Sequence, residues 1–251
     1  MLTTAPLTFV CLHYWAGSGL EWQAVAGLLA PEYEVLGLDL GGFGAAPDPA
    51  GGYSVAAYAD QIAAQIQESR LPRYVLVGHS MGGKIALALA ARQLPGLAGL
   101  VLLNPSPPTS EPMTDAERQT SLKAWGKPGA AEKTFRKIVV RPVPEVMHAQ
   151  IVADNLRSTK AAWEAWLLHG SREDISGRLS PLTVPCLIIA GGSDPIMSPS
   201  VHGLETLPFL PEGTPLEIIP GAGHLLPYEA PTEVAALLRE FAGKHMLAAG
   251  M

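Results

Sequence analysis

Six short apolar runs alternate with helical patterns along this chain, and that alternation limits the folds open to it. Most of the runs are apolar at every position, which is typical of parallel strands covered on both faces. Strands that alternate with helices predict a doubly wound, mainly parallel six-stranded α/β sheet. The expected strands are residues 7–12, 33–38, 74–78, 97–103, 186–190 and 216–219. The expected helices of this core are residues 20–30, 55–69, 82–93, 200–206 and 231–242, with Gly243 just past the last.

The alternation is interrupted once, between the fourth and fifth expected strands. Residues 107–180 contain no strand-like run, only helical patterns. Thr114 and Glu117 form a capping-box pattern at the start of one of them. We therefore expect residues 107–180 to form a helical cap inserted into an α/β core made of residues 1–106 and 181–251. The cap helices are expected from Thr114 toward Trp125 and over residues 130–139, 144–156 and 159–169.

Composition indicates a globular protein, and we expect its partner to be a small-molecule substrate. Of the 251 residues 48% are hydrophobic and 16% charged, and the formal net charge of −6 argues against a nucleic-acid partner. No apolar run approaches the ~20 residues of a membrane span. The first six residues lack a signal-peptide pattern, so we expect a cytoplasmic monomer or homodimer with no membrane partner. Cys11 and Cys186 lie inside apolar runs and are expected to be buried, inert thiols.

The segment YVLVGHSMGGKIALALA, residues 74–90, combines an apolar strand, a turn at Ser80 and a helix of small residues. This is the pattern G-x-S-x-G in the strand–turn–helix context that presents a nucleophilic serine. Such a turn is so sharp that Gly78 and Gly82 face neighbouring backbone, where a Cβ would clash. The N–H groups at the start of the helix point toward Ser80. Ser80 is therefore the expected nucleophile, while the adjacent His79 is expected to point elsewhere and pack.

A serine hydroxyl needs a base to become a nucleophile, and the base needs an orienting carboxylate. Asp194 lies in the loop after the expected strand 186–190, and His224 lies in the loop after the next strand. Because α/β sheets bind ligands at the carboxyl ends of their strands, both side chains are expected near Ser80. Enzymes with this type of turn carry nucleophile, acid and base in the order Ser, Asp, His along the chain, and this sequence has the same order.

With these motifs the chain resembles the α/β-hydrolase superfamily, in the branch of small esterases, C–C hydrolases and cofactor-free perhydrolases with a helical cap. The similarity covers nearly the whole length except the cap. It includes the turn GLDLGGFG at residues 37–44 and the stretch GAGH at residues 221–224, with Glu229 and Pro231 downstream. Many members begin with an antiparallel hairpin, for which this sequence has too few residues before residue 7. Six parallel strands are therefore expected, without that hairpin.

The stretch LHYWAGSG, residues 12–19, departs from the family pattern. In relatives the equivalent stretch reads His-Gly followed by a variable residue whose backbone N–H binds the oxyanion. The resemblance therefore implies Trp15 and Met81 as the two oxyanion amides. Tyr14 stands where the family has glycine, and two interpretations remain open. Its ring packs between loop and sheet, or its hydroxyl lines the site as a third donor.

The expected substrate pocket joins Tyr14 to large apolar side chains of the cap. Trp163 and Trp166 share one helix face, which suits either the contact between cap and core or a substrate wall. The full set of expected pocket residues is Tyr14, Trp125, Met147, Trp163 and Trp166.

These patterns predict a Ser-His-Asp hydrolase that cleaves a small, largely apolar ester or related acyl compound through an acyl-enzyme intermediate. No metal and no organic cofactor are implied. One alternative is a C–C bond hydrolase or cofactor-free perhydrolase with the same triad. Another, of a different class, is a ligand-binding receptor that retains the triad, and turnover of a generic p-nitrophenyl ester would separate it from the enzymes.

Overall fold

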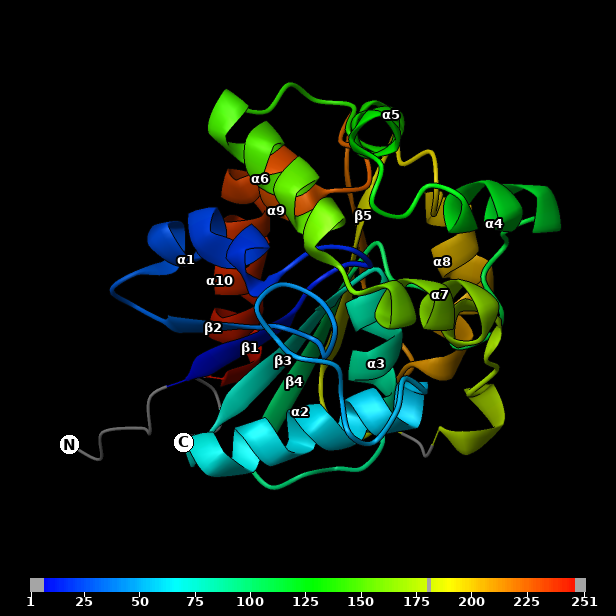
Figure 1. Ribbon diagram of the computed structural model, residues 1–251. Helices are drawn as coiled ribbons and strands as arrows, with labels where there is room; N and C mark the ends of the chain where they lie inside the picture. The colour runs from blue at the N-terminus through cyan, green and yellow to red at the C-terminus, as the bar shows by residue number, and fades with distance from the viewer. Residues whose placement is uncertain (1–6, 180–181, 247–251) are drawn as a thin grey trace.

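The centre of the molecule is a six-stranded sheet in the order β2-β1-β3-β4-β5-β6, with every strand pair parallel (Figure 1). The computed structural model describes residues 7–179 and 182–246. The strands are β1 Thr8–Leu12, β2 Glu34–Leu38, β3 Tyr74–His79, β4 Leu97–Leu103, β5 Cys186–Gly191 and β6 Leu216–Ile219. All six predicted strands are confirmed, and no antiparallel hairpin is present among the described residues.

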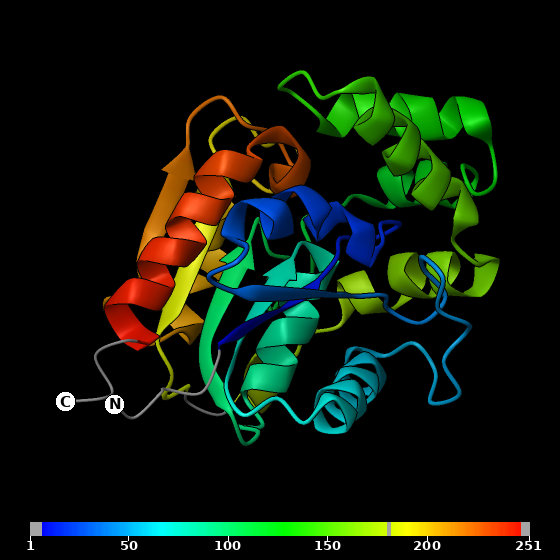
Figure 2. The same cartoon turned by 90° about the vertical axis from the view of Figure 1, so that its left-hand side faces the viewer.

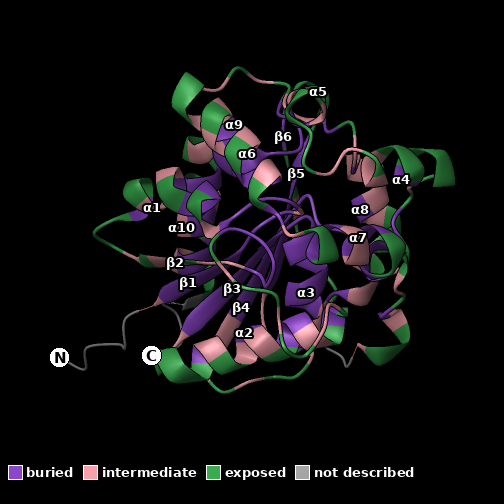
Figure 3. Cartoon of the chain, in the orientation of Figure 1, coloured by how far each residue is buried: buried purple, intermediate pink, exposed green. Residues whose placement is uncertain are grey.

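Helices cover both faces of the sheet, as a doubly wound fold requires. On one face lie α2 Val55–Ser69 and α3 Met81–Ala90, and on the other lie α1 Gln23–Leu29 and α10 Pro231–Met246. Side chains of each strand alternate between two apolar cores. In β1, Val10 and Leu12 join the core under α2 and α3, whereas Phe9 and Cys11 join the core under α1 and α10. Figure 3 shows the central strands of the sheet buried between helices that are partly exposed.

The helices between β4 and β5 lie over the carboxyl edge of the sheet (Figure 2). Thr114 and Glu117 form the predicted capping box at the start of the first of them. These helices are α4 Asp115–Leu122, α5 Pro128–Ile138, α6 Glu145–Arg157 and α7 Lys160–Leu168. The expected boundary between cap and core at residues 180 and 181 falls outside the described residues.

The predicted end of the last helix at Gly243 is wrong, because α10 continues to Met246. A glycine inside a helix costs about 1 kcal/mol relative to alanine. Contacts one turn apart offset that cost: Lys244 Nζ lies 3.1 Å from a carboxylate oxygen of Glu240, and the rings of His245 and Phe241 lie 5.1 Å apart.

Two shorter elements also differ from the expected pattern. The expected helix at residues 20–30 is divided into a 3-10 turn, Gly19–Trp22, and α1. Ser18 begins this turn, and its hydroxyl accepts a hydrogen bond from the Leu20 amide. A short helix that the sequence patterns did not predict, α9 Leu226–Glu229, follows the loop of His224. None of the described helices is long and apolar enough to cross a membrane.

Candidate active site

Ser80 lies on the turn between β3 and α3, where its backbone has φ 52° and ψ −115°. A positive φ is a strained conformation for a residue that carries a side chain. A Cβ on Gly82 would lie 2.6 Å from the carbonyl oxygen of Leu12 and 2.7 Å from that of His13. A Cβ on Gly78 would lie 2.5 Å from the carbonyl oxygen of Gly82. Glycine at both positions therefore allows the turn to be tight enough to raise Ser80 above the sheet.

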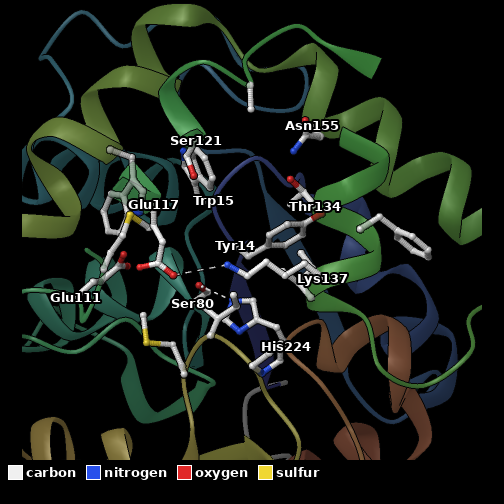
Figure 4. Close-up of a pocket in the computed structure, with 18 of the residues that line it drawn as sticks. Tyr14, Trp15, Ser80, Glu111, Glu117, Ser121, Thr134, Lys137, Asn155 and His224 are labelled. Carbon is white, nitrogen blue, oxygen red and sulfur yellow. Dashed lines mark hydrogen bonds and ion pairs between the residues drawn. The ribbon is translucent and has the colours of Figure 1, made fainter. Parts of the chain in front are cut away.

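The loops after β5 and β6 bring Asp194 and His224 to Ser80. The Ser80 Oγ lies 3.0 Å from His224 Nε2 (Figure 4). His224 Nδ1 lies 2.7 Å from Asp194 Oδ2. The other carboxylate oxygen of Asp194 accepts hydrogen bonds from the amides of Ile196 at 2.7 Å and Met197 at 3.1 Å. Because the carboxylate accepts a hydrogen bond from Nδ1–H, Nε2 carries no proton and can accept that of the Ser80 hydroxyl.

The environment shifts the pKa values of His224 and Asp194 in opposite directions. Burial lowers the pKa of His224, but the charge of Asp194 and its hydrogen bond raise it by more, so the net shift is upward. Burial raises the pKa of Asp194, but the charge and hydrogen bond of His224 and the two amides lower it by more. Both shifts favour a charged imidazolium beside a charged carboxylate when His224 accepts a proton.

The backbone amides of Trp15 and Met81 donate no hydrogen bond to any described residue. Met81 is the first residue of α3, where N–H groups have no acceptor within the helix. The two following amides are engaged, since Gly82 donates to the carbonyl oxygen of His13 and Gly83 to that of Ser80. The amides of Trp15 and Met81 are thus not engaged by another part of the described chain.

Tyr14 lines the cavity with its ring and not with its hydroxyl. The ring packs over Gly17, where a Cβ would lie 2.5 Å from Tyr14 Cε1, and its centroid lies 5.5 Å from that of His79. The hydroxyl oxygen is fully buried and has no hydrogen-bond partner among the described residues. Burial, followed by the proximity of Tyr228, raises the pKa of this hydroxyl. These contacts favour the interpretation that Tyr14 packs between loop and sheet.

Three buried polar side chains that the sequence analysis did not assign to the site hold the loop of His224. His79 Nε2 donates to the carbonyl oxygen of His224 at 2.8 Å, and His79 Nδ1 lies 3.2 Å from the buried carboxylate of Glu21. Asn104 Nδ2 donates to the same carbonyl oxygen at 2.9 Å, while its Oδ1 accepts the amide of Gly191. His79 is therefore a hydrogen-bonding residue of the site and not only a packing residue.

Ser80 and His224 open into a cavity of about 230 Å³ between the cap and the carboxyl edge of the sheet. Its walls are largely apolar and include Tyr14 and Trp15 from the core and Trp163 and Trp166 from α7. Trp166 also packs into the core under α2 and α3, so α7 supplies both a cap–core contact and a wall of the cavity. Other apolar side chains of this cavity are Met113, Ala131, Phe135, Ile138, Ile151, Ile196 and Met197.

Trp125 and Met147 are not among the residues that line this cavity, in contrast to the expectation. The indole N–H of Trp125 donates to the carbonyl oxygen of Ser158 at 2.9 Å, and its ring packs in the cluster that contains Trp163. Met147 packs in the cluster of Tyr14 and neighbouring side chains. Trp125, in the turn after α4, and Met147, on α6, therefore contribute to packing and not to the lining of the cavity.

Few charged side chains face the cavity. The cavity is lined by Glu111 and by the pair of Glu117 and Lys137 (Figure 4). A carboxylate oxygen of Glu117 lies 3.9 Å from Lys137 Nζ. Lys84 is buried nearby, but its ammonium group donates to backbone carbonyl oxygens, among them that of Thr109 at 2.8 Å. Burial lowers the pKa of Lys84 to about 8 and raises that of Glu111.

Comparison with known proteins agrees with this arrangement. The model of the alpha/beta hydrolase family matches residues 9–237. The chain belongs to the alpha/beta hydrolase family. Its sequence is 28% identical over 250 residues to a 2-succinyl-6-hydroxy-2,4-cyclohexadiene-1-carboxylate synthase of Serratia proteamaculans. The matched region covers 92% of this chain and 91% of the synthase.

Solved structures of this family give the same fold. A thermophilic esterase from Thermogutta terrifontis is 27% identical, with a TM-score of 0.79 over 97% of this chain and 92% of the esterase. An esterase from Exiguobacterium antarcticum is 21% identical, with a TM-score of 0.86 over 95% of this chain and 92% of that protein. Alpha/beta hydrolase membership and these neighbours support a hydrolase. The synthase and the esterases carry out different reactions on one fold, so the substrate has to be inferred from the site.

Proposed function

We propose that this alpha/beta hydrolase is a serine esterase that cleaves a small, largely apolar ester or related acyl compound through an acyl-enzyme intermediate. The observation that carries the proposal is the hydrogen-bonded series from Ser80 through His224 to Asp194, with distances of 3.0 Å and 2.7 Å. A nucleophile, a base and an orienting carboxylate at these distances are the requirements for acyl transfer.

Each of the three side chains has one role in the proposed reaction. His224 Nε2 takes the hydroxyl proton as Ser80 attacks the ester carbonyl, and it then donates that proton to the leaving alcohol. Asp194 keeps the imidazole oriented and stabilises its charged form. Water, activated by the same histidine, then attacks the acyl group on Ser80 and releases the acid.

The amides of Trp15 and Met81 are proposed to hold the oxyanion. Negative charge develops on the carbonyl oxygen only as the tetrahedral intermediate forms, so donors fixed in advance stabilise the transition state more than the substrate. The absence of a described acceptor for either amide supports this role. Loss of one such donor typically costs roughly 10²–10³ in rate.

The lining of the cavity supports a neutral substrate. Lys137 supplies the one cationic side chain among the described lining residues, and it already lies 3.9 Å from Glu117. Among the described lining residues, a carboxylate on the substrate would therefore meet one lysine, which already faces a carboxylate. The synthase relative is named for a product with a ring carboxylate. An apolar acyl group suits the aromatic walls of this cavity better.

A panel of p-nitrophenyl esters with acyl chains of increasing length tests the proposal. We expect turnover by the native protein, with kcat/KM falling for long chains, and a loss of at least about 10³-fold in Ser80→Ala. A fluorophosphonate should label the peptide that contains Ser80 and abolish turnover. Full activity in Ser80→Ala would contradict the assignment. Binding without turnover of any ester would favour the receptor alternative, and turnover confined to C–C or peracid substrates would favour the other enzymes.

A further inference from the structure

Glu229 is a buried carboxylate with no role in the proposed reaction. It accepts four backbone hydrogen bonds. Glu229 Oε2 accepts the amides of Val140 at 2.8 Å, Arg141 at 2.7 Å and Gly223 at 2.9 Å. Glu229 Oε1 accepts the amide of Leu225 at 3.0 Å. The side chain is 7% exposed, so its charge is stabilised by these N–H groups and not by bulk water.

The four donors belong to two segments that are far apart in sequence. Gly223 and Leu225 stand on either side of His224, whereas Val140 and Arg141 follow the end of α5 in the cap. A further bond joins the same segments, because the amide of His224 donates to the carbonyl oxygen of Ile138 at 3.0 Å.

The two segments are also in direct contact, with no space for a side chain between them. A Cβ on Gly223 would lie 2.7 Å from Val140 Cγ2 and 2.9 Å from the carbonyl oxygen of Ile138. The guanidinium group of Arg141 extends the contact by donating to the carbonyl oxygen of Pro220 at 2.8 Å. The segment after α5 is thus fixed to the loop of His224 by several independent bonds.

The helix that precedes this segment forms a wall of the cavity. Thr134, Phe135, Lys137 and Ile138 of α5 all line it. Any displacement of α5 by a bound substrate would therefore pull on the bonds that hold His224.

We propose that Glu229 is a positioning residue that joins α5 to the loop of His224, so that this wall of the cavity and the base move as one unit. The proposal rests on the role of His224 as the base in the proposed function. It assigns Glu229 no contact with substrate. It also makes α5 a fixed wall of the cavity.

The variant Glu229→Gln tests this role at almost constant side-chain volume. The carboxamide keeps one acceptor oxygen, but its NH₂ group faces backbone N–H donors, so one of the two segments is released. We expect kcat for a p-nitrophenyl ester to fall about 10- to 100-fold, because small displacements of a reacting group are costly. KM should stay within about threefold, since no substrate contact is removed.

Glu233→Gln is the matched control. Glu233 pairs with Arg141 at 2.7 Å in the same contact region, but its side chain is 46% exposed. Exposed pairs contribute little, so we expect kcat and stability to be almost unchanged. The pH profile separates the two variants further. The charge of Glu229 raises the pKa of His224, so only Glu229→Gln should move the acidic limb of the profile to lower pH.

Amide hydrogen exchange on the native protein tests the coupling without any variant. Groups that are released by one opening event exchange with the same opening free energy. The amides of Val140, Arg141, Gly223 and Leu225 should therefore exchange together, and all four should lose protection in Glu229→Gln.

Two results would overturn the proposal: faster, independent exchange of the cap amides in the native protein, or an unchanged kcat and acidic limb in folded Glu229→Gln. Failure of the proposed function would be seen separately, as full activity in Ser80→Ala or labelling away from Ser80.

Discussion

His79 donates a hydrogen bond from Nε2 to the backbone carbonyl oxygen of His224, 2.8 Å away. Its Nδ1 faces the carboxylate of Glu21 at 3.2 Å, and both side chains are fully buried. His79, the residue just before the nucleophile, therefore belongs to a second, buried histidine–carboxylate pair. This pair holds the backbone of the base, His224, through the hydrogen bond to its carbonyl oxygen.

Removing one member of this pair should destabilise the protein strongly. His79→Leu would leave the Glu21 carboxylate buried without a partner, and we expect about 3–5 kcal/mol to be lost from the free energy of unfolding in urea. The double variant His79→Leu, Glu21→Leu should recover much of that loss, since an apolar pair of similar volume leaves no buried charge. A single variant that costs less than about 1 kcal/mol would mean that the contact between His79 and Glu21 contributes little to stability.

The rate of ester hydrolysis should fall as the solution becomes acidic. His224 accepts a proton only in its neutral form, and its pKa is raised above the ordinary value. The midpoint of the acidic limb of kcat/KM should therefore lie above about 6.5. In Asp194→Asn the charge that raises the pKa is gone, so the limb should move to lower pH while kcat falls about 10⁴-fold. An unshifted limb with a near-native rate would mean that another carboxylate orients the base.

Tyr14→Phe should leave kcat/KM within about twofold, because the hydroxyl has no partner and does not face the cavity. The melting temperature should stay the same or rise slightly, since an unsatisfied buried group is removed. Tyr228→Phe is the control: its hydroxyl is also buried and unpartnered, and the residue does not line the cavity. A drop in kcat of tenfold or more in Tyr14→Phe alone would make the hydroxyl a third oxyanion donor.

Two glycine substitutions should have opposite effects on stability. Gly82→Ala would force a Cβ to within 2.6 Å of a backbone carbonyl oxygen, and we expect loss of folded, active protein. Gly27→Ala in α1 meets nothing within 4 Å. It should raise the free energy of unfolding by roughly 0.5–1 kcal/mol through better helix propensity. A stable, active Gly82→Ala protein would show that the turn relaxes more easily than its contacts imply.

The sheet could be predicted because each strand has a local sequence signal, a continuous apolar run between turn residues. The same reasoning brought Ser80, Asp194 and His224 to one edge, since parallel strands end together. Met147 was misassigned because a helix pattern gives an apolar face but not the element it packs against. Trp125 was misassigned because the helix expected toward it ends at Leu122, so that its ring leaves from a turn. The roles of Glu21 and Glu229 could not be predicted for a related reason, although Glu229 was noted downstream of GAGH. Glu21 meets His79 across 58 residues and Glu229 meets Val140 across 89, and no short pattern encodes such contacts.

Ser80 and His224 are separated by 144 residues, and the strands that carry them, β3 and β6, are not neighbours in the sheet. A chain that has built only β1 to β4 can hold the nucleophile at its turn but has no base. Contacts of such long range form late, because closing the intervening chain costs entropy before any contact rewards it. In a refolding experiment, the return of turnover should therefore lag behind the return of helical signal and report the docking of the last edge of the sheet.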